Sequence, residues 1–173
     1  VHARLGIAQE NSGRLVALVR DEAKKLAKAN GQTFILTDGP PGVGCPVIAS
    51  VGQATAVLII AEPTVSGLHD MERVTQLCRH FKIPAMVCIN KYDLNPEKAS
   101  EIEALARDRQ VEIAGRISFD PVFTEAMLKE QTIFESDNNS QAADEVRQVW
   151  EKVQSLPALS APEKPINFIQ ELS

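Results

Sequence analysis

Residues 34–42 read Phe34-Ile35-Leu36-Thr37-Asp38-Gly39-Pro40-Pro41-Gly42, an apolar run that ends in an aspartate and a turn of glycine and proline. A continuous apolar run of this length predicts a buried strand of a parallel sheet, over residues 33–37. In open α/β sheets, ligands bind outside the carboxyl ends of the strands. An aspartate that leaves a strand at that edge can hold Mg²⁺, directly or through water, beside nucleotide phosphates. The simpler alternative is that Asp38 only caps the turn that follows it.

The turn after Asp38 is a candidate phosphate-contacting segment. Gly39, Gly42 and Gly44 allow the backbone to come close to a ligand, so that its N–H groups can contact a γ-phosphate. Pro40 shapes the same turn. A strand, an aspartate and a glycine-rich turn in this order form the arrangement known as Walker B, and this interpretation is favoured over a capped turn.

Three more apolar runs predict strands, at residues 56–61, 85–89 and 112–117. Helical periodicity separates them, and one further amphipathic helix is predicted after a polar loop over residues 135–141. This alternation predicts an α/β fold with a doubly wound, mostly parallel sheet and helices on both faces. We expect residues 1–135 to form the C-terminal portion of a nucleotide-binding domain, 136–156 a C-terminal helix, and 157–173 an extended or poorly ordered tail containing prolines.

Composition excludes several classes of protein. The 173 residues are 44% hydrophobic and 24% charged, with a net charge of −5, which is typical of a globular domain without a general affinity for nucleic acid. Three cysteines without CxxC spacing predict no disulfide framework and favour a cytoplasmic location. The segment 166–172 is weakly amphipathic, but a packed or frayed end is favoured over a stable membrane anchor. The first residues have no signal-peptide pattern.

A second motif follows the strand at 85–89 and reads Asn90-Lys91-Tyr92-Asp93. An asparagine at the end of a strand can hydrogen-bond a base edge, and a lysine stem can lie along the base plane. Asp93 can accept hydrogen bonds from guanine, as in the NKxD motif of P-loop GTPases. Alternatively, Asp93 or Asn95 only starts the next helix.

A third segment, Glu62-Pro63-Thr64-Val65-Ser66-Gly67-Leu68-His69-Asp70, follows the strand at 56–61. A polar loop that opens a helix at the carboxyl end of a strand is a typical place for a switch segment. The alternative is a turn in which Ser66 caps the helix, with His69 as a surface residue.

Four segments together carry a family resemblance: DGPPGVGCPVIAS (38–50), EPTVSGLHD (62–70), INKYDLN (89–95) and FDPVFTEAM (119–127). In this order and spacing they resemble the MinD superfamily of P-loop ATPases, in the branch that contains an inserted ferredoxin domain. The resemblance covers roughly residues 3–135. It implies that Asp38 is the Walker B aspartate, bound to Mg²⁺ through water, and that Asn90 contacts the base. Asp120 and Pro121 match the loop over the base and ribose, although Ser118 departs from the proline usual at its position.

The resemblance also implies ATP and Mg²⁺ as cofactors and a homodimer in the intact protein. The family's work is ATP hydrolysis coupled to iron–sulfur cluster or electron-transfer chemistry, so an iron–sulfur or redox partner is expected. An Fe–S cluster is expected only in the ferredoxin insert. Cys45 belongs to the family's GxGCP turn, where a structural role is favoured over a reactive or metal-bridging thiol. Two alternatives stay open: a GTPase that uses the NKxD motif, and a non-catalytic interaction module with a vestigial nucleotide fold.

The phosphate loop itself is missing, because none of the nine glycines is followed by lysine. The family's KGGxGKT segment and ferredoxin insert would precede Val1, and we do not expect hydrolysis by these residues alone. In the family, the phosphate-loop strand lies between the strand that ends before Asp38 and the strand at 56–61. We therefore expect these two strands to pair directly, or a second chain or the N-terminal residues to cover the edges.

Overall fold

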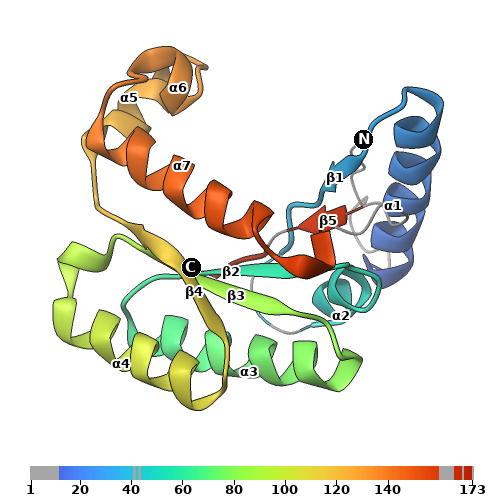
Figure 1. The fold of residues 1–173 in the computed structure, drawn as a ribbon, viewed down its shortest axis with the longest axis horizontal. Helices are drawn as coiled ribbons and strands as arrows, with labels where there is room; N and C mark the ends of the chain where they lie inside the picture. The colour runs from blue at the N-terminus through green and yellow to red at the C-terminus, as the bar shows by residue number, and fades with distance from the viewer. Residues whose placement is uncertain (1–11, 41, 43, 160–165, 169, 173) are drawn as a thin grey trace.

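The chain folds as a layered α/β structure in a computed structural model that describes residues 12–40, 42, 44–159, 166–168 and 170–172 (Figure 1). The helices are α1 (Ser12–Ala29), α2 (Cys45–Val51), α3 (Val65–Phe81), α4 (Pro96–Asp108), α5 (Pro121–Leu128), α6 (Ile133–Ser136) and α7 (Gln141–Gln154). The strands are β1 (Phe34–Leu36), β2 (Val57–Ala61), β3 (Ala85–Asn90), β4 (Glu112–Ile117), β5 (Ile166–Phe168) and β6 (Gln170–Leu172). Two short 3₁₀ helices are η1 (Tyr92–Leu94) and η2 (Pro157–Leu159).

All strand pairs are parallel, as the apolar runs predict. One sheet has the order β4-β3-β2-β6, and a second pairs β1 with β5. Each of the predicted strands at 56–61, 85–89 and 112–117 is present to within one residue. The strand before Asp38 is shorter than predicted, at Phe34–Leu36. The predicted fold class is confirmed.

The C-terminal segment lies between β1 and β2, which corrects the sequence-based expectation for these strands. Leu36 of β1 is in register with Phe168 of β5, and Ile59 of β2 is in register with Gln170 of β6. Within the described residues β1 and β2 do not pair with one another; β1 pairs with β5, and β2 pairs with β6. Two parallel edges need partners for their N–H and C=O groups, and here the C-terminal segment supplies them.

Helices cover both faces of the sheet because successive strand residues point to opposite sides. Ile59 and Val87 face a core built with α2, α3 and α4. Leu58 and Met86 face a second core, to which α7 contributes Val149 and Val153. Figure 1 shows α3 and α4 on one side of the sheet and α7 on the other. The doubly wound arrangement is therefore confirmed.

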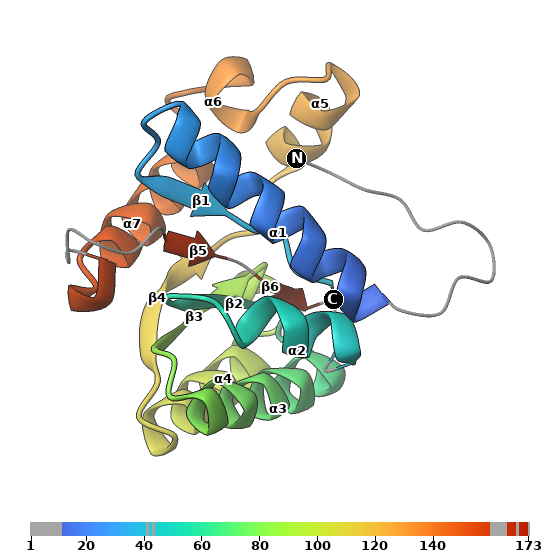
Figure 2. The same cartoon turned by 90° about the vertical axis from the view of Figure 1, so that its right-hand side faces the viewer.

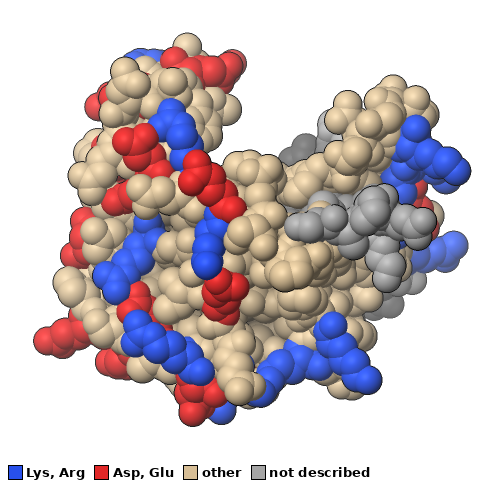
Figure 3. All heavy atoms as spheres, in the orientation of Figure 1, with Lys and Arg blue, Asp and Glu red and all other residues tan. Residues whose placement is uncertain are grey.

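The α5–α6 end projects from the sheet (Figure 2). It has its own small cluster, in which Ile133 and the α7 residues Ala142 and Ala143 pack with Val122 and Phe123. A space-filling view shows the molecule hollowed between this end and the end formed by α1 and β1 (Figure 3).

Local boundaries differ from the sequence-based ones at three places. The cap of α3 is Thr64, whose hydroxyl accepts from the N–H of Gly67 at 2.9 Å, and not Ser66. Helix α6 occupies part of the segment expected to be a loop. Helix α2 was not predicted as an element; Pro46 stands in its first turn, where a missing N–H costs nothing.

A buried arginine fixes α2 to α1. Arg20 is 1% exposed, and its Nη1 donates to the carbonyls of Ala49, at 3.2 Å, and Ser50. These carbonyls belong to the last turn of α2, the negative end of its dipole. Burial lowers the pKa of Arg20, against a smaller opposing effect of Asp21. The contact joins the last turn of α2 to α1.

Candidate functional site

The predicted site residues lie at the carboxyl edge of the parallel strands. Asp38 is exposed two residues beyond β1, and Asn90 is the half-buried last residue of β3. Strands β2, β3 and β4 are parallel neighbours in one sheet, whereas β1 lies in the second sheet, parallel to β5. Asp38 and Asn90 therefore both follow the carboxyl ends of parallel strands, but of strands in different sheets.

The turn that follows Asp38 begins with residues whose backbone packs against the rest of the protein. Gly39 is buried, and Pro40 is half-buried. Gly42 has φ 83°, a left-handed conformation that side chains rarely adopt. Gly44, with extended backbone, is the N-cap residue of α2 and has no side chain that could close the helix terminus. The first turn of α2 therefore has no side-chain cap.

Lys91 joins the ends of β2 and β3. Its Nζ lies 2.5 Å from Oε1 of Glu62, the residue directly after β2. Lys91 has φ 54°, so the backbone reverses sharply there and η1 follows at once. The lysine predicted to lie along a nucleotide base is thus paired with Glu62. This ion pair joins the segment 90–93 to the segment 62–70.

Asp93 and Asp120 both have structural partners. Oδ1 of Asp93 accepts from the backbone N–H of Phe119 at 2.7 Å. Oδ1 of Asp120 accepts from the N–H of Val122 at 2.9 Å and caps α5, with Pro121 at its first turn. Asp93 does not start α4; the cap there is Asn95, which accepts from Lys98 N–H at 3.0 Å. The structure therefore brings Asn90, Lys91 and Asp93 next to the loop that contains Asp120.

Sequence reasoning missed Glu145, which holds this loop from α7. One of its oxygens accepts from the backbone N–H of Ser118 at 2.7 Å and from its hydroxyl at 2.8 Å. Burial acts to raise the pKa of Glu145, but the hydrogen bonds from Ser118 and Gln141 outweigh it and the pKa is lowered. The contact joins residues 27 positions apart, so no local sequence pattern points to it.

A second network, of charged side chains from α4 and β4, stabilises the turn after β3. Glu103 of α4 is 6% exposed and accepts from Nε of Arg116 at 2.6 Å and from Nη2 of Arg107 at 3.0 Å. The guanidinium of Arg116 lies 5.5 Å from the ring centre of Tyr92, within η1. The turn after β3 is thus braced by β4 and α4 as well as by Asp93.

Carboxylates do not cluster into a preformed metal site. Across residues 12–159, apart from 41 and 43, and the two C-terminal strands, no group of three His, Cys, Asp or Glu side chains is placed to hold an ion. Asp38 stands alone, as an exposed carboxylate. This fits a magnesium ion that is bound mainly by waters and phosphates, since Mg²⁺ usually takes only one or two protein carboxylates in such sites.

Charges of both signs alternate on the face in Figure 3, rather than gather by sign. None of the helices in the described ranges has the length and apolar character needed to span a bilayer.

The fold is that of the MinD-type P-loop NTPases. The cell division ATPase MinD of Pyrococcus furiosus superposes with a TM-score of 0.65 at 20% identity, over 82% of this chain and 58% of that one. A chain of the MinC:MinD cell division protein complex of Aquifex aeolicus superposes with a TM-score of 0.67 at 20% identity, over 88% of this chain and 62% of that one. At these identities the likeness establishes the fold.

Among curated proteins, the chain is similar to two uncharacterized proteins of Methanocaldococcus jannaschii. One is 28% identical over 153 residues, which is 88% of this chain and 50% of that protein. The other is 26% identical over 61% of this chain and 39% of that protein. A cytosolic Fe-S cluster assembly factor NUBP1 homolog of Caenorhabditis briggsae is 24% identical over 70% of this chain and 45% of that protein. The chain thus spans half or less of the length of these relatives. No protein-family profile matches it.

Proposed function

We propose that this chain supplies the magnesium aspartate and the base-side pocket of a MinD-type ATPase. The observation that carries the proposal is that Asp38, Asn90 and Asp120 each stand at or just after the carboxyl end of a strand (β1, β3 and β4) in a chain with the MinD fold. Asp38 would hold Mg²⁺ through water, and Asn90 would contact the base. When bound, the ion would offset the negative charge of the phosphates.

The protein's own residues prepare the two ends of this site. The glycines of the turn after Asp38 would let the backbone come close to the phosphate oxygens. Lys91, held by Glu62, and the loop at Asp120, held by Asp93 and Glu145, enclose the base side. A phosphate loop with its lysine would come from sequence outside these 173 residues, since none of their glycines precedes a lysine.

ATP is favoured over GTP by a specific contact. Guanine recognition by an NKxD motif needs the aspartate to accept from the base. One oxygen of Asp93 already accepts a hydrogen bond from the N–H of Phe119, so this structural contact accounts for an aspartate at position 93. Coupling to iron–sulfur or electron-transfer work in a homodimer belongs to the same proposal. It is supported by the likeness to the NUBP1 homolog and to the MinD fold.

The first test is the reading frame upstream of the codon for Val1. An in-frame Gly-Lys-Thr segment supports the proposal, and a start signal directly before Val1 contradicts it. The product of the complete reading frame is then assayed for MgATP hydrolysis. We expect activity that Asp38→Ala abolishes and Asn90→Ala weakens, while Asp137→Ala, at an exposed loop position, leaves it unchanged.

Nucleotide binding separates the alternatives. The complete protein should bind MgATP more tightly than MgGTP, and a clear preference for GTP would establish the GTPase reading instead. If neither nucleotide binds and neither changes the oligomeric state, the chain is an interaction module with a vestigial fold.

A further inference from the structure

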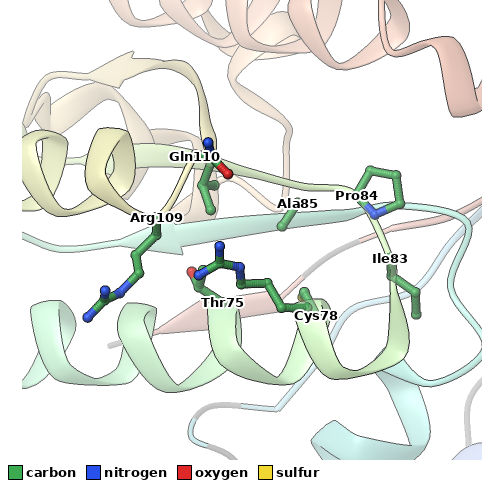
Figure 4. A pocket seen from close by; sticks show the side chains of 9 residues that line it. Thr75, Cys78, Ile83, Pro84, Ala85, Arg109 and Gln110 are labelled. Atoms are coloured by element: carbon green, nitrogen blue, oxygen red, sulfur yellow. The ribbon is translucent and has the colours of Figure 1, made fainter.

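A pocket of about 170 Å³ opens at the amino ends of β3 and β4 (Figure 4). It lies between α3 and the turn that joins α4 to β4, with Pro84 and Ala85 at the start of β3. Strand β3 runs from Ala85 at this pocket to Asn90 at the candidate nucleotide edge. The pocket is therefore separate from the site described above.

Thr75 of α3 lines the pocket with an unpaired hydroxyl. The residue is 0% exposed, and its Oγ1 has no hydrogen-bond partner. A threonine inside a helix often donates to a carbonyl one turn earlier, and Thr75 does not. A buried hydroxyl without a partner is costly, so its retention beside a pocket points to a ligand that completes the bond.

Arg109 provides a second unused donor. Its Nη2 lies 2.6 Å from Glu72 and its Nη1 3.0 Å from Asp108, and these contacts fix the guanidinium. Its Nε is buried and has no partner. In Figure 4, Arg109 reaches from the end of α4 toward the helix that carries Thr75. The two unpaired donors thus come from the two elements that form the walls.

The charge of the lining selects an anion. Arg109 and Arg79 both line the pocket, and no aspartate or glutamate does. Arg79 makes no ion pair with any side chain in the described part of the chain. Glu72 and Asp108 take up part of the charge of Arg109, but Arg79 leaves a net positive charge beside the hydroxyl.

Size restricts the ligand further. The volume of about 170 Å³ is well below the roughly 300–1,000 Å³ of pockets that hold drug-sized molecules. We propose that this pocket binds a small oxyanion of the size of inorganic phosphate. The Thr75 hydroxyl and the Nε–H of Arg109 donate to the oxyanion, Arg79 neutralises its charge, and the Gln110 amide closes the side toward β4.

The test is a titration of the ¹⁵N-labelled 173-residue chain with inorganic phosphate, followed by NMR at constant ionic strength. We expect saturable shifts at the amides of Ala85, Gln110 and Val111. Thr75→Val keeps the shape of the side chain and removes only the hydroxyl, and it should weaken the apparent affinity about tenfold. Arg79→Gln should weaken it by a similar factor. Arg73→Gln removes the same charge from an exposed position of α3 and should leave the affinity unchanged.

Several results would overturn the proposal. One is the absence of saturation up to tens of millimolar phosphate. Another is an equal response to chloride at the same ionic strength, which would indicate screening alone. An affinity that Thr75→Val leaves unchanged would also exclude the pocket. Shifts confined to the residues around Asp38 and Asn90 would place the anion at the opposite edge.

Discussion

The carboxylate of Asp93 accepts a hydrogen bond from the backbone N–H of Phe119, 2.7 Å away, and joins the turn after β3 to the segment after β4. Asp120, the next residue, caps α5. Two loops that we propose to surround a nucleotide base are therefore held to one another by a side chain that the sequence motif would assign to base recognition.

Replacement of Asp93 by alanine should lower the free energy of unfolding by about 1–2 kcal/mol, because the Phe119 N–H loses a charged acceptor. Asp93→Asn keeps an acceptor oxygen and should cost less. Urea unfolding of both variants measures the difference. If neither variant changes stability, but both reduce affinity for GTP in the complete protein, then Asp93 is a guanine-reading residue.

Gly115 of β4 leaves room for α7. A Cβ at this position would lie 2.7 Å from Cγ2 of Val149, whose β-branched side chain is stiff in a helix. Gly115→Ala should therefore destabilise the fold by about 1–3 kcal/mol. The double variant Gly115→Ala/Val149→Ala relieves the overlap. Its loss in stability should be smaller than the sum of the single losses, and additive losses would refute the contact as the cause.

The pH dependence of stability should include Glu145. Its pKa is lowered from 4.5 in the folded state, because hydrogen bonds from Ser118 and Gln141 favour the carboxylate more than burial disfavours it. A depressed pKa stabilises the fold above the unfolded-state value, and this contribution disappears as pH falls through the folded-state value. Glu145→Gln should thus be destabilising at pH 7 by about 1 kcal/mol. The gap to the unmodified protein should narrow below about pH 4 in acid-unfolding experiments, whereas a gap independent of pH would rule out the charge as its cause.

The strands were predictable because their residues are aliphatic and buried on both faces, so that β2 and β3 read as uninterrupted apolar runs. The cap of α3 was misassigned because Thr64 and Ser66 have the same chemistry two positions apart. Only the geometry shows that the Thr64 hydroxyl receives the Gly67 N–H.

The tail and Glu145 could not be predicted, for a different reason. Pro165 and the polar residues of the segment 166–172 give no local sign of a strand inside a sheet, and pairing with β1 and β2 depends on edges more than a hundred residues earlier. The contact of Glu145 with Ser118 is likewise set by how α7 crosses β4. Sequence motifs identify ligand-binding side chains next to the end of a strand. Contacts that remote elements make with such a site can be recognised only in the folded structure.

The three thiols should differ sharply in reactivity. Burial raises the pKa of Cys78 to about 12 and, with a smaller effect of Glu145, that of Cys88 to about 12, so neither is a thiolate at neutral pH. Cys45 is exposed. We expect one equivalent of a thiol reagent to react quickly with the folded protein and two more after unfolding. A fast reaction of Cys78 or Cys88 under native conditions would contradict the buried positions.

The C-terminal segment should stabilise the centre of the sheet. Its residues pair with Leu36 and Phe34 of β1 and with Ile59 and Ala61 of β2. Removal of residues 160–173 leaves both edges without partners and should cost roughly 2–4 kcal/mol, if each lost backbone hydrogen bond contributes about 1 kcal/mol. Hydrogen exchange should accelerate at the β2 amides that face β6 and much less at those that face β3. A variant that replaces 166–172 with a glycine–serine repeat of equal length tests whether strand formation, rather than chain length, is responsible. Exchange rates in β2 that stay the same in both variants would show that the segment contributes nothing to the sheet.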